Sequence, residues 1–242
     1  MPRKSRADRT LQASEFRRRL LRWFRRHGRD LPWRRTRDPY HIVVSEFMLQ
    51  QTQVSRVEAY YHRFLQQYPS IELLAAAPAA TVRESWEGLG YYRRAANLHR
   101  LAQTVVAEHG GVVPSDPALL RRLPGVGRYT AGAVACFAYE RATPAVDTNV
   151  ARVIGRAFHP RIRGPAAARR AWETAALIVP SHGKRAWEFN QAIMELGALV
   201  CTARIAWCGK CPVRDACLTG MRTPMGTARR VRPFACRVTR PT

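Results

Sequence analysis

Apolar residues recur along most of this chain at the three- and four-residue spacing of amphipathic helices. Leu98, Leu101 and Val105 form one such face, and their segment stops at Gly110-Gly111, a pair typical of a helix C-terminus. Alternation of the β-strand kind is scarce, and no internal repeat of about 20–50 residues is visible. The spacing predicts helices over 11–27, from Pro39 to about residue 53, around 57–64, and over 71–77, 81–86, 93–109 and 131–138.

Two local signals and the last stretch of the chain sharpen this outline. Asp38-Pro39 is a good N-cap and first-turn pair, and Asp116-Pro117 starts a short helix in the same way. Residues 221–242 are basic, contain proline and show no period, so we expect a disordered tail there. The sequence therefore predicts an all-α fold followed by a basic tail.

The balance of charge is unusual. The 242 residues include 41 Lys and Arg against 17 Asp and Glu, which gives a formal net charge of +24. A coding bias would favour Arg, because Lys4, Lys184 and Lys210 are the only lysines, but it does not account for the scarcity of acids. A field of this sign attracts polyanions, so nucleic acid or an anionic membrane is the expected partner.

The hydropathy of the chain bears on its compartment. Residues 1–15 lack the apolar segment of a secretion signal, and the longest weakly polar run, 73–82, is too short to span a bilayer. We therefore expect a soluble, cytoplasmic protein. In that compartment six cysteines more often bind metal or lie buried than form disulfides. Cys136 fits a core thiol, and Cys236 belongs to the tail.

The string Leu-Pro-Gly-Val-Gly-Arg at 123–128 joins two predicted helices by a tight glycine turn. Gly125 and Gly127 can adopt positive φ, and glycine lets the backbone approach another surface closely. The N–H groups that begin the next helix, beside Val126 and Arg128, then point outward. Phosphate oxygens can accept them without any reading of sequence. An ordinary corner between two helices would account for Gly-x-Gly alone.

Four of the cysteines follow a C-x6-C-x2-C-x5-C pattern. Four thiolates so close in sequence can surround one soft metal centre. A zinc site is the nearest alternative, although zinc ribbons usually combine two separate Cys-x-x-Cys pairs. Arg204, Lys210 and Arg214 lie between the cysteines and fit either phosphate contacts or a solvated basic face. The candidate ligands are Cys201, Cys208, Cys211 and Cys217.

Two acidic residues have suggestive neighbours, but neither is decisive alone. Glu46 lies among bulky apolar residues of a predicted helix, although a single helical acid usually faces solvent. Asp147 stands where a helix N-cap belongs, and capping would fully account for it. From the residues alone, both remain open between a chemical and a structural role.

Taken together, these strings resemble the endonuclease III superfamily of DNA glycosylases, and within it the adenine glycosylases. The hairpin with its following Thr-Ala resembles the superfamily's helix-hairpin-helix, and the cysteine spacing matches its [4Fe–4S] pattern. Ser-Glu-x-Met-Leu-Gln-Gln-Thr-Gln-Val at 45–54 and Val-Asp-x-Asn-Val-x-Arg-Val at 146–153 are similar to the two acid-bearing motifs of adenine glycosylases. The family usually has Gly where Thr148 stands. The matches extend over roughly residues 20–217.

The resemblance implies a role for each acid. Glu46 would be the general acid that protonates the flipped adenine and then handles the water. Asp147 would stabilise the positively charged sugar of the transition state. Tyr129 and Asn149 match positions that assist these acids. The residues expected to bind DNA phosphates are Gly125, Val126, Gly127 and Arg128.

The resemblance also implies a base pocket and a wedge. Trp33, Arg34 and Gln191 match residues that line the adenine pocket. Tyr91, in a Gly-Leu-Gly-Tyr-Tyr string, matches the tyrosine that wedges into the DNA stack, and Gln51 belongs to the same interface. Base flipping requires such a plug, because the unstacking energy must be offset. Without the resemblance, Trp33 and Tyr91 would both be assigned to core packing.

The distribution of lysine bears on the mechanism. A glycosylase that also nicks DNA through a Schiff base needs an unprotonated amine, and no lysine occurs between Lys4 and Lys184. Tyr129 stands where endonuclease III carries its lysine, so we expect base removal without strand cleavage. Tyrosine at this position also occurs in thymine–guanine mismatch glycosylases, so it does not decide the base.

The sequence therefore predicts an all-α, two-lobed helix-hairpin-helix glycosylase fold. The resemblance assigns a six-helix barrel with the hairpin to 31–141. It assigns a lobe with one [4Fe–4S] cluster per chain to 1–30 and 142–220. Double-stranded DNA would lie across the groove between the lobes, with Glu46 and Asp147 facing each other there.

The expected activity is removal of adenine paired with 8-oxoguanine or guanine, by a nucleoid-associated monomer with no membrane partner. The alternatives are a thymine–guanine mismatch glycosylase and, from another class, a non-catalytic DNA-binding module. About 25 residues follow Cys217, too few for the lesion-reading domain of full-length adenine glycosylases. We therefore expect weaker discrimination between 8-oxoguanine and guanine than in a two-domain relative.

Overall fold

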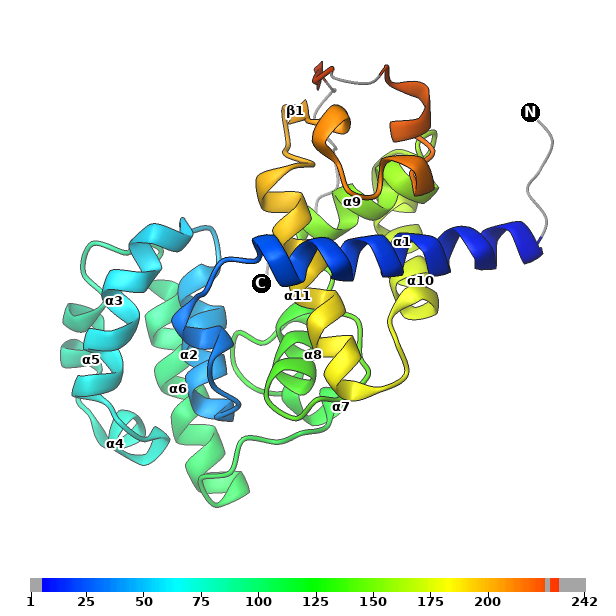
Figure 1. The fold of residues 1–242 in the computed structure, drawn as a ribbon. Helices are drawn as coiled ribbons and strands as arrows, with labels where there is room; N and C mark the ends of the chain where they lie inside the picture. Colours follow the sequence, from blue (N-terminus) through cyan, green and yellow to red (C-terminus); the bar gives the residue numbers. More distant parts are fainter. Residues whose placement is uncertain (1–5, 225–226, 231–242) are drawn as a thin grey trace. The chain divides into compact units, whose positions relative to one another are not determined.

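The computed structural model describes residues 6–224 and 227–230, and in this part it contains eleven α-helices. The helices form two compact units (Figure 1). The middle unit is Asp30–Glu140, and the outer unit combines the described residues before Asp30 with the described residues after Glu140. The outer unit is therefore built from two segments that are far apart in the sequence, and the middle unit from one continuous segment. None of the described helices combines the length and the apolar character needed to cross a membrane.

The middle unit begins with a 3-10 turn, η1, and continues with seven α-helices. Their bounds are η1 Pro32–Arg34, α2 Pro39–Leu49, α3 Val54–Gln67, α4 Ile71–Ala76, α5 Ala79–Ser85, α6 Arg93–His109, α7 Pro117–Leu120 and α8 Arg128–Phe137. The predicted caps are confirmed, because the carboxylates of Asp38 and Asp116 accept N–H groups at the start of α2 and α7. The predicted length of α2 was too great, since the helix ends at Leu49 rather than near residue 53.

The core of the middle unit forms around α8, in which every residue from Thr130 to Phe137 is buried. Its side chains are mostly small and apolar, so neighbouring helices can approach it on all sides. Cys136 lies there fully buried, which confirms it as a core thiol. α2 packs against α8, α3 and α6 and contributes Phe47 and Met48 to this core.

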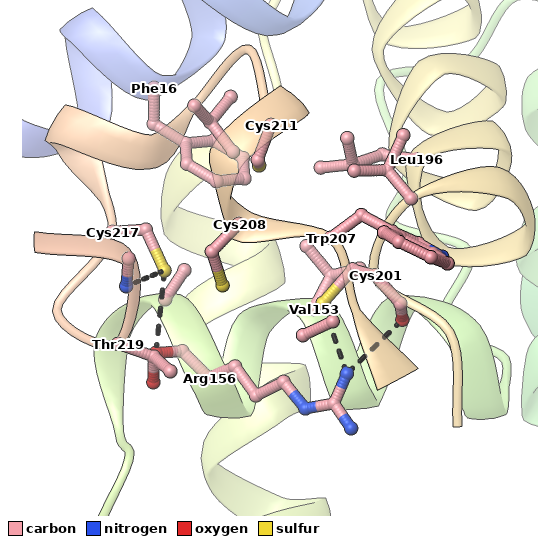
Figure 2. A pocket seen from close by; sticks show the side chains of 15 residues that line it. Phe16, Val153, Arg156, Leu196, Cys201, Trp207, Cys208, Cys211, Cys217 and Thr219 are labelled. Atoms are coloured by element: carbon pink, nitrogen blue, oxygen red, sulfur yellow. Dashed lines mark hydrogen bonds between the residues drawn. The ribbon is translucent and has the colours of Figure 1, made fainter. Parts of the chain in front are cut away.

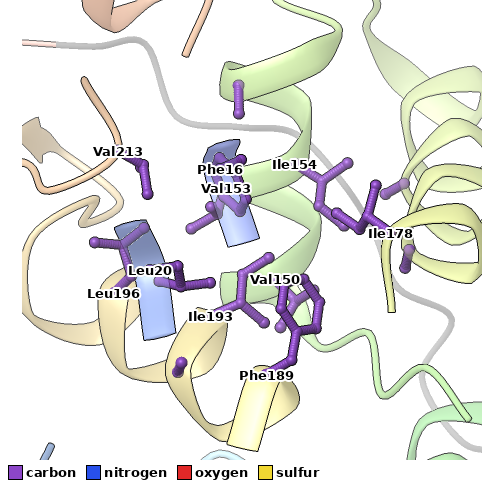
Figure 3. Packing of buried hydrophobic residues seen from close by; sticks show 14 of the residues in the cluster. Phe16, Leu20, Val150, Val153, Ile154, Ile178, Phe189, Ile193, Leu196 and Val213 are labelled. Atoms are coloured by element: carbon purple, nitrogen blue, oxygen red, sulfur yellow. The ribbon is translucent and has the colours of Figure 1, made fainter. Parts of the chain in front are cut away.

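The outer unit is built from four long helices followed by short elements. Their bounds are α1 Arg6–His27, α9 Thr148–Phe158, α10 Gly164–Ile178, α11 Gly183–Leu199, β1 Ile205–Ala206, η2 Cys208–Lys210, η3 Arg214–Ala216, η4 Gly220–Arg222 and β2 Arg229–Arg230. Figure 3 shows its core, where Phe16 and Leu20 of α1 pack with Val150 and Ile154 of α9 and Ile193 of α11. Burial of these side chains fixes α1 to helices that come much later in the sequence.

The last described elements fall in the segment that was predicted to be a tail. β2 pairs antiparallel with β1, with Ile205 opposite Arg230 and Ala206 opposite Arg229. The prediction of an aperiodic tail from residue 221 is therefore wrong for η4 and β2. The rest of that segment, 231–242 with Cys236, lies outside the described residues.

Candidate functional site

Glu46 lies in the middle of α2, and only 5% of its surface is exposed. All residues from Ile42 to Met48 are buried, and the Oε2 atom of Glu46 is fully enclosed. The alternative of a solvent-facing helical acid is therefore wrong. Burying a carboxyl group among apolar side chains costs stability, so this position suits a functional group better than a structural one.

The turn between α7 and α8 depends on Gly125. Its φ is +76°, and a Cβ there would lie 2.8 Å from Asn97 Cβ and 2.9 Å from a ring carbon of Phe47. Gly127 departs from the prediction of positive φ, because its φ is −86° and it serves as the N-cap of α8. A Cβ placed on Gly127 would meet no atom within 4 Å. The backbone at the start of α8 is thus open to close approach.

Three further predicted residues lie beside this turn. Val126 is buried, Arg128 is exposed, and Tyr129 is partly buried in the first turn of α8. α8 packs against α2, the helix that carries Glu46. Partial desolvation of its side chain, together with the positive charge of nearby Arg121, lowers the pKa of Arg128. An anion bound beside these two cations would relieve their repulsion.

Asp147 caps α9, as its structural interpretation predicts. The Val150 N–H donates to Oδ1 at 2.7 Å, and the side-chain amide of Asn149 donates to Oδ2 at 2.8 Å. Burial raises the pKa of Asp147, while these two hydrogen bonds and the charge of Arg152 oppose that shift. The same contacts that cap the helix therefore also fix the orientation of the carboxylate.

Hydrogen bonds continue from Asn149 to the first cysteine. Arg152 Nη2 donates to Asn149 Oδ1 at 2.7 Å, and Arg152 Nε donates to the Cys201 carbonyl at 2.8 Å. Gly197 permits this approach, because a Cβ there would lie 2.7 Å from Asn149 Cβ. In the sequence, Arg152 stands out only as part of a motif, and its hydrogen bonds to Asn149 and Cys201 could not be predicted. Gly197 in α11 was the signal in the sequence that another segment packs closely there.

The four predicted cysteine ligands line a single pocket of the outer unit (Figure 2). The pocket has a volume of about 400 Å³, including its opening. Phe16 of α1, Val153 of α9 and Leu196 of α11 form part of its wall. The structure thus brings together all four residues that the spacing singled out, against the core of the unit.

Two of the four sulfur atoms accept hydrogen bonds in this pocket. Arg156 Nη1 donates to Cys201 Sγ, and the Gly220 N–H donates to Cys217 Sγ, both at 3.3 Å. Burial raises the pKa of Cys217 to about 11 and also raises that of Cys211. Buried thiols of this kind ionise readily only beside positive charge, and donors to sulfur stabilise the resulting thiolates. The four cysteines are therefore the candidate ligands of a metal centre or cluster. Among the described residues, no three His, Cys, Asp or Glu side chains are arranged to hold a single metal ion.

The residues predicted for the base pocket are divided between the units. Trp33 and Arg34 belong to η1 in the middle unit, and Gln191 belongs to α11 in the outer unit. Trp33 is 5% exposed and meets the Tyr61 ring edge to face at 5.5 Å. Trp33 therefore packs inside the middle unit, and its place in a base pocket stays a prediction. Gln191 is also buried, and Arg34 is partly buried.

The two residues predicted for the wedge lie at the surface of the middle unit. Gln51 follows α2, and Tyr91 precedes α6. Both are exposed, and both adopt positive φ, 59° and 50°. Core packing is therefore wrong for Tyr91.

Comparison with known proteins decides the family. The profile described as HhH-GPD superfamily base excision DNA repair protein matches residues 44–175. The chain belongs to the HhH-GPD superfamily. A relative named adenine DNA glycosylase, from Mycolicibacterium smegmatis, is 48% identical over 218 residues, which are 89% of this chain and 74% of that protein.

Other proteins share the HhH-GPD region. The adenine DNA glycosylase of Homo sapiens is 43% identical over 222 residues, 87% of this chain and 40% of that protein. The thymine-DNA glycosylase of Aeropyrum pernix is 38% identical over 84% of this chain and 93% of that protein. The solved structure of a thermostable thymine-DNA glycosylase has a TM-score of 0.81 at 31% identity, and covers 88% of this chain and 99% of its own. The predicted helix-hairpin-helix glycosylase fold is confirmed.

Proposed function

We propose that this chain is an adenine DNA glycosylase that hydrolyses the N-glycosidic bond of adenine paired with 8-oxoguanine or guanine. The observation that carries the proposal is the buried carboxyl group of Glu46 in the middle of α2. Its motif resembles that of adenine glycosylases, and the Mycolicibacterium smegmatis relative with that name is 48% identical. The proposal concerns these 242 residues, which span 40% of the human relative.

The two acids have different tasks in the proposed reaction. Glu46 donates a proton to the adenine as its bond to the sugar breaks, and then accepts a proton from the water that adds to the sugar. Asp147, oriented by Asn149 and the Val150 N–H, stabilises the positive charge that develops on the sugar. Tyr129, on a helix that packs against α2, assists Glu46.

Recognition of the base uses Trp33, Arg34 and Gln191. A side-chain amide carries both a donor and an acceptor, so Gln191 can pair with the edge of adenine, which presents both. Gln51 and Tyr91 enter the base stack when the adenine leaves it. Both are exposed, as such a role requires.

The hairpin is the proposed phosphate site. The backbone at Gly127 is open, and the first N–H groups of α8 donate hydrogen bonds to the oxygens of one phosphate. Arg121 and Arg128 add positive charge beside it. Gly125 holds the turn, and Val126 packs beneath it. Such contacts bind double-stranded DNA without reading its sequence.

Cys201, Cys208, Cys211 and Cys217 hold one [4Fe–4S] cluster in the proposed enzyme. The spacing of the four cysteines matches the [4Fe–4S] pattern of the family, whereas zinc ribbons usually combine two separate Cys-x-x-Cys pairs. The cluster would supply iron ions that stabilise the thiolates and can exchange an electron. Arg156 and the Gly220 N–H contribute hydrogen bonds to the sulfurs.

Duplexes with single mismatches test the proposal. Adenine should be released opposite 8-oxoguanine and guanine, and scored as strand cleavage after alkali, with an A·T duplex as control. Release of thymine alone, opposite guanine, would instead assign the activity named for the Aeropyrum pernix relative. If the protein binds these duplexes but releases no base from any of them, the alternative of a non-catalytic DNA-binding module is the correct one. Single-turnover rates at one salt concentration compare the two adenine mismatches.

A second assay tests the absence of lyase chemistry. The DNA backbone should stay intact until heat or alkali is applied, because Tyr129 occupies the position of the endonuclease III lysine. Borohydride would trap a Schiff base as a covalent protein–DNA adduct. An abundant adduct that survives replacement of Lys184 and Lys210 would refute the argument from the lysine positions.

A further inference from the structure

Two turns of the middle unit share a strained backbone. Gln51, between α2 and α3, has φ of 59°, and Tyr91, between α5 and α6, has φ of 50°. Residues other than glycine rarely adopt a backbone conformation with positive φ. Where they do, the surrounding structure must stabilise that conformation. Gly88 and Gly90, beside Tyr91, also have positive φ. Something in the fold must therefore stabilise both turns.

The guanidinium group of Arg94 binds both turns. Arg94 lies near the start of α6, and only 6% of its surface is exposed. Its Nη1 atom donates to three carbonyls of the α2 end, and its Nη2 atom donates to Thr52 and to two carbonyls of the second turn. The acceptors are Phe47 O at 2.9 Å, Met48 O at 2.7 Å, Gln50 O at 2.6 Å, Thr52 Oγ1 at 3.0 Å, Leu89 O at 3.3 Å and Gly90 O at 3.0 Å. The acceptors come from both sides of Gln51 and from the residues just before Tyr91.

The surroundings of Arg94 are those of a buried cation bound by the backbone. In the described part of the chain it forms no ion pair with a carboxylate, and the rings of Trp86 and Tyr91 lie 5.5 and 5.4 Å from its guanidinium carbon. Burial lowers the pKa of Arg94 to about 10, so it remains protonated at neutral pH. The last carbonyls of α2 have no partner within the helix and carry its negative dipole end, which suits a cation.

We infer that Arg94 is a positioning residue that holds Gln51 and Tyr91 in place before DNA binds, so that both can enter the base stack together. This inference rests on the proposed function, which assigns these two side chains to the wedge. Fixing the turns in advance removes an ordering cost that would otherwise oppose base extrusion. Lysine cannot replace the guanidinium, because one ammonium cannot reach acceptors on both turns at once.

Hydrogen exchange tests the positioning without any assay of activity. In Arg94→Lys, amides of 50–53 and 88–92 should exchange faster than in the wild type, while those of α8 should not. Arg100→Lys is the matched control, because Arg100 is exposed on the same helix and, among the described residues, its side chain donates a hydrogen bond to Asn97 alone. Thr52→Val removes one acceptor and should show a smaller change, even if Arg94→Lys folds poorly. Unchanged exchange of both turns in Arg94→Lys and Thr52→Val would overturn the inference.

Kinetics separate positioning from general damage to the fold. Single-turnover release should slow roughly 10- to 100-fold in Arg94→Lys for adenine paired with guanine in a duplex. It should change little for an unpaired adenine in a one-base bulge, where less unstacking is needed. Equal losses on both substrates would mean that Arg94 only stabilises the fold, which overturns the inference. If the wild type releases adenine from neither substrate, the proposed function fails, and hydrogen exchange still decides whether Arg94 holds the turns.

Discussion

The two candidate carboxylates are held in opposite ways. Glu46 lies mid-helix in the middle unit, within a run of buried residues that extends from Ile42 to Met48. Asp147 lies at a helix start in the outer unit, where an N–H group and a side-chain amide donate to its two oxygens. The first environment costs stability and suits proton transfer, and the second holds a negative charge at a fixed orientation.

This difference predicts separable effects of mutation. Glu46 lies mid-helix, and glutamine has nearly the same size and shape, so Glu46→Gln should alter chemistry more than folding. Asp147 combines a chemical task with a helix cap, so its replacement should alter both. Asp147 is also connected through Asn149 and Arg152 to the cysteine loop. Four measurements test this contrast.

Replacement of Glu46 should have the largest effect. Glu46→Gln keeps the shape of the side chain but cannot supply the proton, so adenine release should fall roughly 10²–10⁴-fold. Affinity for mismatched DNA and the melting temperature should change little. Single-turnover rates, DNA binding and thermal unfolding measure the three quantities. Near-normal release would remove Glu46 from the reaction.

Replacement of Asp147 should affect two properties. Asp147→Asn retains a good capping side chain but loses the charge, so release should fall roughly 10²–10³-fold with little change in stability. Asp147→Ala should also lose the cap, at a cost of about 0.5–2 kcal/mol in the free energy of unfolding. If Asp147→Ala loses stability while Asp147→Asn keeps full activity, the residue is only a cap.

Replacement of a cysteine tests the connection to the loop. Cys211→Ser should lose the brown absorbance of the cluster and weaken DNA binding, because the loop would no longer hold its shape. Amide hydrogen exchange at the start of α9 should become faster, whereas exchange in α2 should not change. Cys136→Ala is the control, because this thiol is buried in α8 of the other unit. One zinc and no iron per chain in anaerobically prepared wild type would contradict the cluster.

The smallest effect is a dependence of stability on pH. Burial raises the pKa of Asp147 above its ordinary value of 3.8, so between the two values the folded state retains a proton that the unfolded state has released. The free energy of unfolding should therefore fall as the pH rises through this window. Asp147→Asn should lack this contribution. Denaturant unfolding of both proteins across the window measures the difference, and identical pH profiles would contradict it.

Helix boundaries were predictable where local signals define them. α6 runs from Arg93 to His109, as predicted, and ends at Gly110 with positive φ. α2 ends earlier than predicted, because Arg94 binds its last carbonyls and the chain reverses at Gln51. β2 was missed because its partner strand lies more than twenty residues earlier in the chain and two residues show no period.

By itself, the sequence determined the helical periodicity, the caps at Asp38 and Asp116, the turn at Gly125 and the spacing of the cysteines. Each of these depends on residues close together in the chain. Only the tertiary structure decided that Arg94, Arg152 and Arg156 are buried and what they bind. Their main partners are backbone carbonyls of distant segments. Every residue has a backbone carbonyl. The pattern of side chains therefore does not indicate which carbonyls accept hydrogen bonds from a buried guanidinium group.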